Sequence, residues 1–426
     1  MSAEVESLKK SLTVYRGLAE VSGLIASITD YDELLRAILD VARRVVSAEA
    51  ASLFLVDEIS GSLDLALSSH ADGEFVPGKL SVPKGRGIAG WVFEHREAVL
   101  VPDAYADPRF YREADRATGF RTRSILCAPL EGDTGLLGVL QVLNPRDKDR
   151  FDAEELEGFA AYADLTAAAI EKLRSLAKLR LQERVQRELD IAAEIQRELL
   201  SRALPSETPR ARFSAYNRPS ANVGGDFYHV FPRASGEIFF AIGDVSGKGI
   251  PASLLMAETI GAMQFVFASS SGPHDALEKL NRSLHQRIVR GMFVTLLAGC
   301  LDPDRGLLLL ASAGHCQPLI ARVDGSVTPA GVLPALPLGI LPEVAYSTTQ
   351  IPMGPGDLLI SFTDGLTESK AGTGGQFFEE QIIHTSSAAG VANADHLVAA
   401  LVDAEERHRG AFPQRDDLTL LVGGLK

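Results

Sequence analysis

One unbroken stretch without Pro or Gly, from Phe159 to Leu204, constrains this chain more than any other feature. Because Pro and Gly are the residues that helix interiors disfavour most, this stretch predicts one long helix. Asp152 is placed to cap its first turn, with Glu155 reaching back in a capping box. Pro205 marks its end. The chain is therefore expected to fold as separate units on either side of a helix.

The apolar residues of this helix approximate the alternating spacing of four and three that is typical of coiled coils, with a slip of one residue near Glu183. The pattern favours a parallel homodimer through residues 173–204. A plain amphipathic helix that packs on its own domains is the alternative. The positions are Leu165, Ala169, Leu176, Leu179, Val185, Leu189, Ala192 and Leu199.

The segment before the helix mixes helical and strand patterns. Apolar residues at helical spacing predict two amphipathic helices, the first through Leu18, Val21, Ile25 and Ile28, the second through Leu34, Ile38, Val41 and Val45. Short apolar runs separated by turn residues then predict strands at Ala51–Val56, Leu63–Leu67, Val99–Val101, Ile125–Leu130 and Leu137–Leu143. Helices flanking an antiparallel sheet make an α+β domain.

This N-terminal segment resembles the GAF sensory domains over residues 12–172. The resemblance rests on GRGIAGWVFEHREAVLVPDAYADPRF, SILCAPL, GVLQVLN and the helix that starts at FDAEEL. Its GRGIAG also fits GxGxxG, but without the βαβ unit and the downstream acid of a dinucleotide site, so that reading is disfavoured. A sensory role is implied, and the sequence does not identify the ligand.

In the C-terminal half, apolar strands alternate with corners that present aspartates. The corners are VGGDFY with Asp226, FFAIGDVSGKG with Asp244, LLISFTDGLTE with Asp364, and RDDLTLLV with Asp416 and Asp417. Two of these strands end at an aspartate and two begin after one, so the carboxylates can converge at one sheet edge. Each aspartate taken alone is more often a turn or cap residue.

Clustered carboxylates repel one another unless a cation neutralises them, and Mg²⁺ and Mn²⁺ prefer oxygen ligands. Two such ions acidify a bridging water and draw charge from a phosphoryl group. The dispersed aspartates therefore suggest a two-metal centre for phosphoryl chemistry. A P-loop at SGKG is disfavoured, because the spacing is wrong and no Ser or Thr follows Lys248.

From Leu189 to Val422 the chain resembles the SpoIIE-like, or RsbU-like, branch of the PPM phosphatases. The carrying phrases are IQRELLSRALP, YNRPSANVGGDFY, AIGDVSGKGIPASLLMA, MFVTLLAGCLDP, ASAGHCQPLI, LPLGIL, GDLLISFTDGLTES and RDDLTLLVG. The resemblance implies two Mn²⁺ or Mg²⁺ ions. Asp244 would bridge them, the Val245 backbone carbonyl would ligate one, and Asp226, Asp364 and Asp416 would complete the catalytic site, with Asp417 the alternative to Asp416.

The same resemblance implies an α/β/β/α sandwich over residues 205–426. Its implied activity is removal of phosphate from phosphoserine or phosphothreonine of a protein, commonly a STAS-fold anti-sigma-factor antagonist, under control of the GAF domain. The chain departs from many relatives at Lys248, where His is common, and at His229, where an acid is common. Arg218 is only a candidate for binding phosphate, and His315 is expected to be structural.

Composition limits the partners and the compartment. A formal net charge of −14 argues against a nucleic-acid surface. Three cysteines without CxxC spacing indicate neither a disulfide framework nor a zinc site, and no signal peptide or membrane span is expected, so a cytoplasmic protein is predicted. Two other functions stay open, namely a pseudo-phosphatase that only binds its partner and a hydrolase of small phosphate esters.

Overall fold

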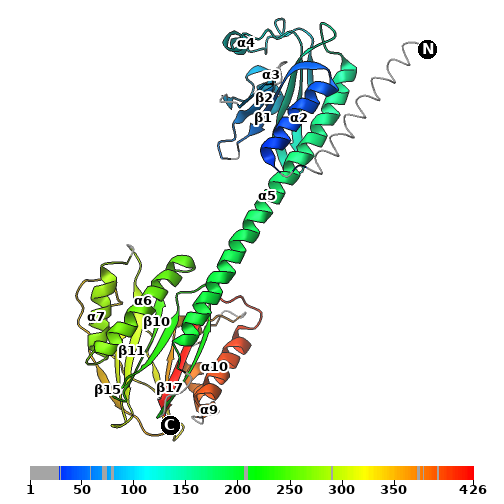
Figure 1. Cartoon of the computed structure of the whole chain (residues 1–426). Coiled ribbons are helices and arrows are strands. Elements are labelled where there is room, and N and C mark those ends of the chain that lie inside the picture. The colour runs from blue at the N-terminus through cyan, green and yellow to red at the C-terminus, as the bar shows by residue number, and fades with distance from the viewer. Residues whose placement is uncertain are drawn as a thin grey trace. The chain divides into compact units, whose positions relative to one another are not determined.

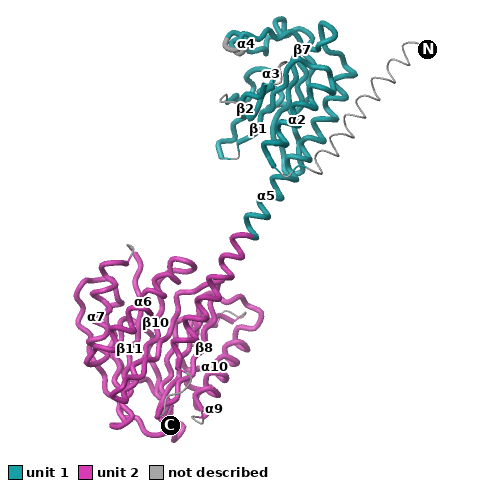
Figure 2. Tube along the Cα trace, in the orientation of Figure 1, with its two compact units in different colours: residues 1–183 teal, residues 184–426 magenta. Residues whose placement is uncertain are grey.

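The structure is a computed structural model, and it describes residues 28, 30–57, 59–69, 74–77, 81–205, 210–288, 291–371, 375–377, 379–390 and 393–426. The chain divides into two compact units, Met1–Glu183 and Arg184–Lys426 (Figure 2). The division falls inside one 50-residue helix, α5 (Ala153–Arg202), so the long helix predicted from the sequence is present. Asp152 and Glu155 form the predicted capping box, each accepting a hydrogen bond from the other's backbone N–H at 3.0 Å.

The first unit is built on an antiparallel seven-stranded sheet (Figure 1). Its strands lie in the order β3-β2-β1-β7-β6-β5, with β4 paired to β2, and the five strands predicted from the sequence all belong to it. The elements are α2 (Tyr31–Val45), β1 (Ala48–Val56), β2 (Leu63–Ser69), β3 (Phe75–Pro77), β4 (Ser81–Val82), α3 (Gly87–His95), β5 (Val99–Val101), α4 (Arg112–Thr118), β6 (Ile125–Gly132) and β7 (Gly135–Pro145).

Two hydrophobic cores cover the two faces of this sheet. On one face α2 and the start of α5 pack together, and the buried Tyr162 hydroxyl donates to the Ile38 carbonyl at 2.7 Å. On the other face α3 packs through Ile88 and Val92. The second predicted N-terminal helix is thus confirmed as α2, with Leu34, Ile38 and Val41 buried. The first predicted helix falls, except for Ile28, outside the described residues.

The second unit is a sandwich of two antiparallel five-stranded sheets. One sheet has the order β15-β12-β11-β10-β9 and the other β14-β13-β16-β17-β8. The strands are β8 (Ala211–Arg218), β9 (Phe227–Pro232), β10 (Ile238–Val245), β11 (Val294–Asp302), β12 (Leu307–Ala313), β13 (Leu319–Ala321), β14 (Val327–Pro329), β15 (Thr349–Pro352), β16 (Leu358–Phe362) and β17 (Leu418–Leu425).

Helices cover the outer faces of this sandwich, which confirms the α/β/β/α architecture. Helices α6 and α7 pack on the sheet that contains β10, and α9 and α10 on the sheet that contains β17 (Figure 1). These helices are α6 (Ile250–Ser269), α7 (Pro273–His285), α9 (Glu379–Ala389) and α10 (Ala394–Arg409), and the short α8 (Asp364–Thr367) follows β16. Among the described residues only α6 is long and apolar enough to span a membrane, but Leu255, Ile260, Met263 and Phe267 bury one of its faces in the core.

Candidate metal centre

Neighbouring antiparallel strands bring the predicted aspartates to one end of each sheet. In one sheet Asp226 immediately precedes β9, and Asp244 lies near the end of the adjacent β10. In the other sheet Asp364 follows β16, and Asp416 and Asp417 precede the adjacent β17. Since antiparallel neighbours end and begin at the same sheet edge, each pair of corners is held together by the strand ladder.

The carboxyl groups of Asp226 and Asp244 form the buried centre of this site. Asp226 is only 1% exposed. Burial and the charge of Asp244 hold the pKa of Asp226 well above its usual range. Burial, with the charges of Asp364, Asp416 and Asp417, raises the pKa of Asp244 to about 7. Acids that perturb one another in this way share one site, and a bound cation would relieve their repulsion.

Two threonines that the sequence reading missed fix the Asp226 carboxylate. The Thr363 hydroxyl donates to Asp226 Oδ2 at 2.7 Å and accepts from the Thr419 backbone N–H at 2.9 Å. The Asn217 amide in turn donates to the Thr419 hydroxyl at 2.7 Å. These residues come from three adjacent strands or strand ends, β8, β16 and β17, so the second sheet orients an aspartate that the first sheet carries. Their positions beside the FTDG and DDL corners were the only sequence signal.

Asp416 and Asp417 have different surroundings although they are adjacent. The buried Asp417 carboxylate accepts hydrogen bonds from the Ser220 N–H at 2.7 Å, the Ser220 hydroxyl at 2.9 Å and the Gly225 N–H at 2.7 Å. The Asp416 side chain is 38% exposed; one of its oxygens lies 3.0 Å from the Lys248 ammonium, and the other accepts from the Asp417 N–H at 3.0 Å. Asp417 therefore binds the loop that carries Asp226, whereas Asp416 faces solvent with its oxygens more accessible.

Close backbone approaches explain the two glycines of VGGD. A Cβ at Gly224 would lie 2.2 Å from an Asp417 carboxylate oxygen, and one at Gly225 would lie 2.8 Å from the Val245 carbonyl oxygen. Real Cβ atoms do not come this close, so only glycine lets the loop pass here. The same contact places the Val245 carbonyl, a predicted ligand, against the residue that precedes Asp226.

The long helix α5 reaches this loop directly. The side-chain amide of Gln196 donates to the Gly224 carbonyl at 2.8 Å, and its carbonyl oxygen accepts from the Gly224 N–H at 3.1 Å. Gln196 is buried, so this double hydrogen bond is shielded from water. The helix is thus bound to Gly224, which lies two positions before Asp226 in the sequence.

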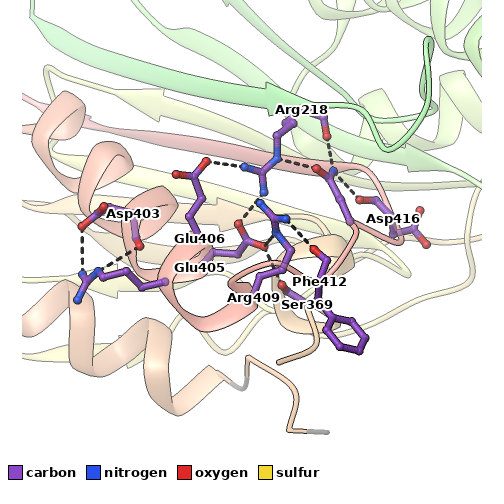
Figure 3. Close-up of polar contacts among 10 residues, drawn as sticks. Arg218, Ser369, Asp403, Glu405, Glu406, Arg409, Phe412 and Asp416 are labelled. Carbon is purple, nitrogen blue, oxygen red and sulfur yellow. Dashed lines mark hydrogen bonds and ion pairs between the residues drawn. The ribbon is translucent and has the colours of Figure 1, made fainter. Parts of the chain in front are cut away.

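Arg218 is engaged by acids and an amide instead of facing the aspartates (Figure 3). Its guanidinium donates to Glu405 at 2.6 Å, to Glu406 at 2.7 Å and to the Gln414 side-chain oxygen at 2.6 Å. Glu405 is buried and also accepts from Ser369 and Arg409. Although burial raises the pKa of Glu405, these hydrogen bonds and charges lower it below its usual value. Arg218 therefore has a structural role, which counts against the phosphate-binding role considered from the sequence.

Two histidines that the sequence singled out are buried. His229 packs near Phe231 and Phe267, neither ring nitrogen has a hydrogen-bond partner, and burial lowers its pKa to about 4. His315 Nδ1 lies 3.0 Å from the Thr295 hydroxyl, and burial lowers its pKa to about 4 as well. Both are neutral near pH 7, in keeping with the structural role expected for His315.

The donor set suits hard divalent cations. It consists of carboxylates and one backbone carbonyl, which are the oxygen ligands that Mg²⁺ and Mn²⁺ prefer. Within the described part of the chain, no three His, Cys, Asp or Glu side chains already surround one point closely enough to hold an ion. The acids are therefore brought together by the strand topology, and they act on one another through their charges, without a preformed ligand cage.

Comparison with known proteins identifies both units. Residues 30–170 match the family model of the GAF domain, and residues 234–425 match the model described as Stage II sporulation protein E (SpoIIE). The chain therefore contains a GAF domain followed by a SpoIIE-like phosphatase domain of the PPM family.

Individual relatives agree with this assignment. Phosphoserine phosphatase RsbU of Bacillus subtilis (strain 168) is 29% identical over 246 residues, which cover 57% of this chain and 71% of that protein. The SiaA-PP2C domain of Pseudomonas aeruginosa shares the fold, with a TM-score of 0.51 and 22% identity over 58% of this chain and 99% of that one. The protein is thus a protein serine/threonine phosphatase of a metal-dependent class.

The GAF unit has its own relatives. The dual 3',5'-cyclic-AMP and -GMP phosphodiesterase 11A of Takifugu rubripes is 36% identical over 141 residues, which are 31% of this chain and only 16% of that protein. A cavity of about 220 Å³ in this unit is lined mainly by apolar side chains, among them Phe54, Ile88 and Phe110, with Arg86 and Gln141 as polar groups.

Proposed function

We propose that this phosphatase uses two Mn²⁺ or Mg²⁺ ions to hydrolyse phosphoserine or phosphothreonine in a STAS-fold anti-sigma-factor antagonist. The observation that carries the metal site is the meeting of the acids at one end of the sandwich, where burial and the charges of neighbouring acids, Asp416 among them, raise the pKa of Asp226, Asp244 and Asp364. The likeness to RsbU supports a phosphoprotein substrate, and the resemblance to the SpoIIE-like branch supports the STAS fold.

The residues of this site fall into metal ligands and residues that hold those ligands in place. Asp244, Asp226, Asp364, Asp416 and the Val245 carbonyl would hold the ions, with Asp417 assigned to the loop. When bound, the ions activate a water molecule and draw charge from the phosphoryl group. Thr363 keeps the Asp226 carboxylate in one orientation, and Asp417 keeps the preceding loop closed through Ser220 and Gly225.

We further propose that the GAF domain regulates the phosphatase through α5. The helix is continuous across the boundary between the two units, so no flexible break absorbs a change at one end. One of its contacts with the catalytic unit is the pair of hydrogen bonds between Gln196 and Gly224, in the loop that carries Asp226. A shift or rotation of α5 would therefore act on the metal centre.

A homodimer through α5 belongs to the same proposal. The described part of the helix exposes large apolar side chains at Leu176, Leu179, Leu181, Val185, Ile191 and Ile195. The predicted seam residues at its ends, Ala169 and Leu199, instead pack on their own units, so the seam would be confined to the middle of the helix. Light scattering at micromolar concentration tests this, and a monomeric mass throughout would exclude the dimer.

The function is tested by incubating the full chain and Mn²⁺ with a phosphorylated STAS protein. The expected result is phosphate release that EDTA stops. Parallel reactions with p-nitrophenyl phosphate and free nucleotides separate the alternatives. Turnover of nucleotides but not of the phosphoprotein would indicate a small-ester hydrolase, and binding without turnover of any substrate would indicate a pseudo-phosphatase. A cytoplasmic location fits this role.

A further inference from the structure

Lys248 places a positive charge among the acids of the candidate metal centre. It lies in the loop between β10 and α6, flanked by Gly247 and Gly249, which both have positive φ. Its ammonium lies 3.0 Å from an Asp416 carboxylate oxygen and donates to the Arg415 carbonyl. A single side chain from the β10 loop thus contacts both Arg415 and Asp416, the first two residues of the RDD corner before β17.

The charge of Lys248 also reaches the neighbouring acid. Burial and the charges of Asp416 and Glu368 raise the pKa of Asp364, and the positive charge of Lys248 opposes them. Lys248 therefore offsets repulsion between Asp364 and Asp416, which is the electrostatic effect that a bound metal ion also has. The lysine side chain is 52% exposed, so it can leave its partner for water without the cost of unpairing a buried charge.

We propose that Lys248 is a resident cation of the metal centre, which holds Asp416 in the metal-free protein and must be displaced before a divalent ion can use that carboxylate. This inference rests on the metal centre proposed above. Displacement breaks the ion pair between Lys248 and Asp416 and leaves an ammonium near a divalent ion, which repels it. Lys248 therefore lowers the affinity of the site for metal. In exchange, it keeps Asp364 and Asp416 together while no metal is bound.

A second lysine in the same unit provides a matched control. Lys279 on α7 pairs with the Asp275 carboxylate at 2.9 Å and donates to the Ser269 carbonyl at 3.0 Å. It therefore makes the same two kinds of contact as Lys248, but on acids that the proposed centre does not include. Replacing either lysine removes one positive charge from an already acidic protein.

The test is calorimetric titration of Mn²⁺ into the EDTA-treated and desalted full chain. Lys248→Met is expected to bind Mn²⁺ about twofold to tenfold more tightly than the wild type, because no ion pair has to be broken and no ammonium repels the ion. Lys248→Arg keeps the charge and should bind like the wild type, as should Lys279→Met. Circular dichroism checks folding, and Lys248→Gln replaces Lys248→Met should the latter not fold.

Unchanged or weaker Mn²⁺ binding by Lys248→Met would overturn the proposal, as would an equal gain in Lys279→Met. Phosphate release by the wild type separates this failure from failure of the proposed function. A wild type that hydrolyses the phosphoprotein while Lys248→Met gains no affinity disproves only the role of Lys248. A wild type that binds no Mn²⁺ disproves the metal centre, and the inference falls with it.

Discussion

The side-chain amide of Gln414 donates a hydrogen bond to the Asp416 backbone carbonyl at 2.7 Å, two residues further along the chain. The same amide nitrogen donates to the Arg218 carbonyl at 2.7 Å, and the Gln414 oxygen accepts from the Arg218 guanidinium. Because Arg218 ends β8 and is anchored by Glu405 and Glu406, these bonds tie the Asp416 corner to a fixed ion-pair network (Figure 3).

Gln414→Ala should therefore weaken Mn²⁺ binding more than it weakens the fold. The substitution frees the Asp416 corner and removes one acceptor from Arg218, which corresponds to roughly 1–2 kcal/mol, or about five- to thirtyfold in affinity. Calorimetric titration measures the affinity and urea denaturation the stability. Asn281→Ala is the control, since Asn281 on α7 bonds the Leu341 and Gly339 backbone and should lose stability without losing affinity. Equal Mn²⁺ affinities for Gln414→Ala and wild type would refute the positioning role.

Asp244→Asn and Asp364→Asn should each abolish metal-dependent turnover. Each change removes a negative charge from the proposed ion site, and a loss of roughly a hundredfold or more in phosphate release is expected at saturating Mn²⁺. Both variants should stay folded, because the neutral amide also removes repulsion between buried acids. Asp324→Asn, in the exposed turn between β13 and β14, is the matched control and should keep full activity. Near wild-type turnover by both site variants would show that the metal assignment is wrong.

Substitution of Asp416 and substitution of Asp417 should have different effects on Mn²⁺ affinity and on stability. Asp416→Asn is expected to lose Mn²⁺ affinity with almost no change in the free energy of unfolding, because its side chain is half-exposed. Asp417→Asn weakens buried hydrogen bonds to Ser220 and Gly225, so the free energy of unfolding should fall by about 1–3 kcal/mol. Urea denaturation of metal-free protein and Mn²⁺ titration together decide the matter. The reverse pattern would make Asp417 the ligand and Asp416 the structural residue.

His229 should make the phosphatase unit less stable as the pH falls. Burial lowers its pKa from 6.5 to about 4, so the unfolded chain binds a proton at a pH where the folded chain does not. The stability that His229 contributes is complete above about pH 6.5 and is lost as the pH falls toward 4. His229→Leu removes this dependence. Thermal midpoints of both proteins between pH 7 and 4.5 should diverge progressively toward low pH, and parallel curves would contradict the prediction.

The sequence predicted the elements and the acidic corners because those signals are local. Absence of Pro and Gly predicted α5, and strands that end or begin at aspartates predicted where Asp226, Asp244 and Asp364 would meet. The hydrogen-bond partner of each aspartate, in contrast, depends on residues that are distant in the sequence. Whether Asp416 or Asp417 faces the loop depends on the packing of residues 219–225, which lie almost two hundred positions away in the chain.

The residues that support the metal site could not be predicted for the same reason, because their contacts also join segments that are distant in the sequence. Thr363 and Thr419 meet only because β16 pairs with β17, and Gln196 meets Gly224 only because the end of α5 packs on the sandwich. In α5 the apolar pattern was ambiguous for another physical reason. The apolar residues along one face of the helix have two different surroundings. Ala169 and Leu199 pack on their own units, whereas Leu179 and Val185 between them are exposed. A heptad pattern alone does not distinguish these partners.

The last prediction concerns the length of α5. One residue inserted near Glu183 rotates everything on one side of it by about 100° relative to the other, whereas seven residues add nearly two whole turns and restore the facing of both ends. The single insertion should therefore change Mn²⁺ affinity or turnover strongly, and the seven-residue insertion should recover much of the starting behaviour. Phosphate release at several Mn²⁺ concentrations measures both quantities.

Two further variants locate where the helix acts. Gln196→Ala removes both hydrogen bonds to Gly224, so turnover should then respond much less to the single insertion, because the rotation no longer reaches the loop that carries Asp226. A flexible Gly/Ser replacement of Leu176 to Arg187 should likewise uncouple the two units. If that replacement leaves basal turnover, its Mn²⁺ dependence and its response to the GAF signal all unchanged, α5 is a passive tether and the regulatory role of the helix is refuted.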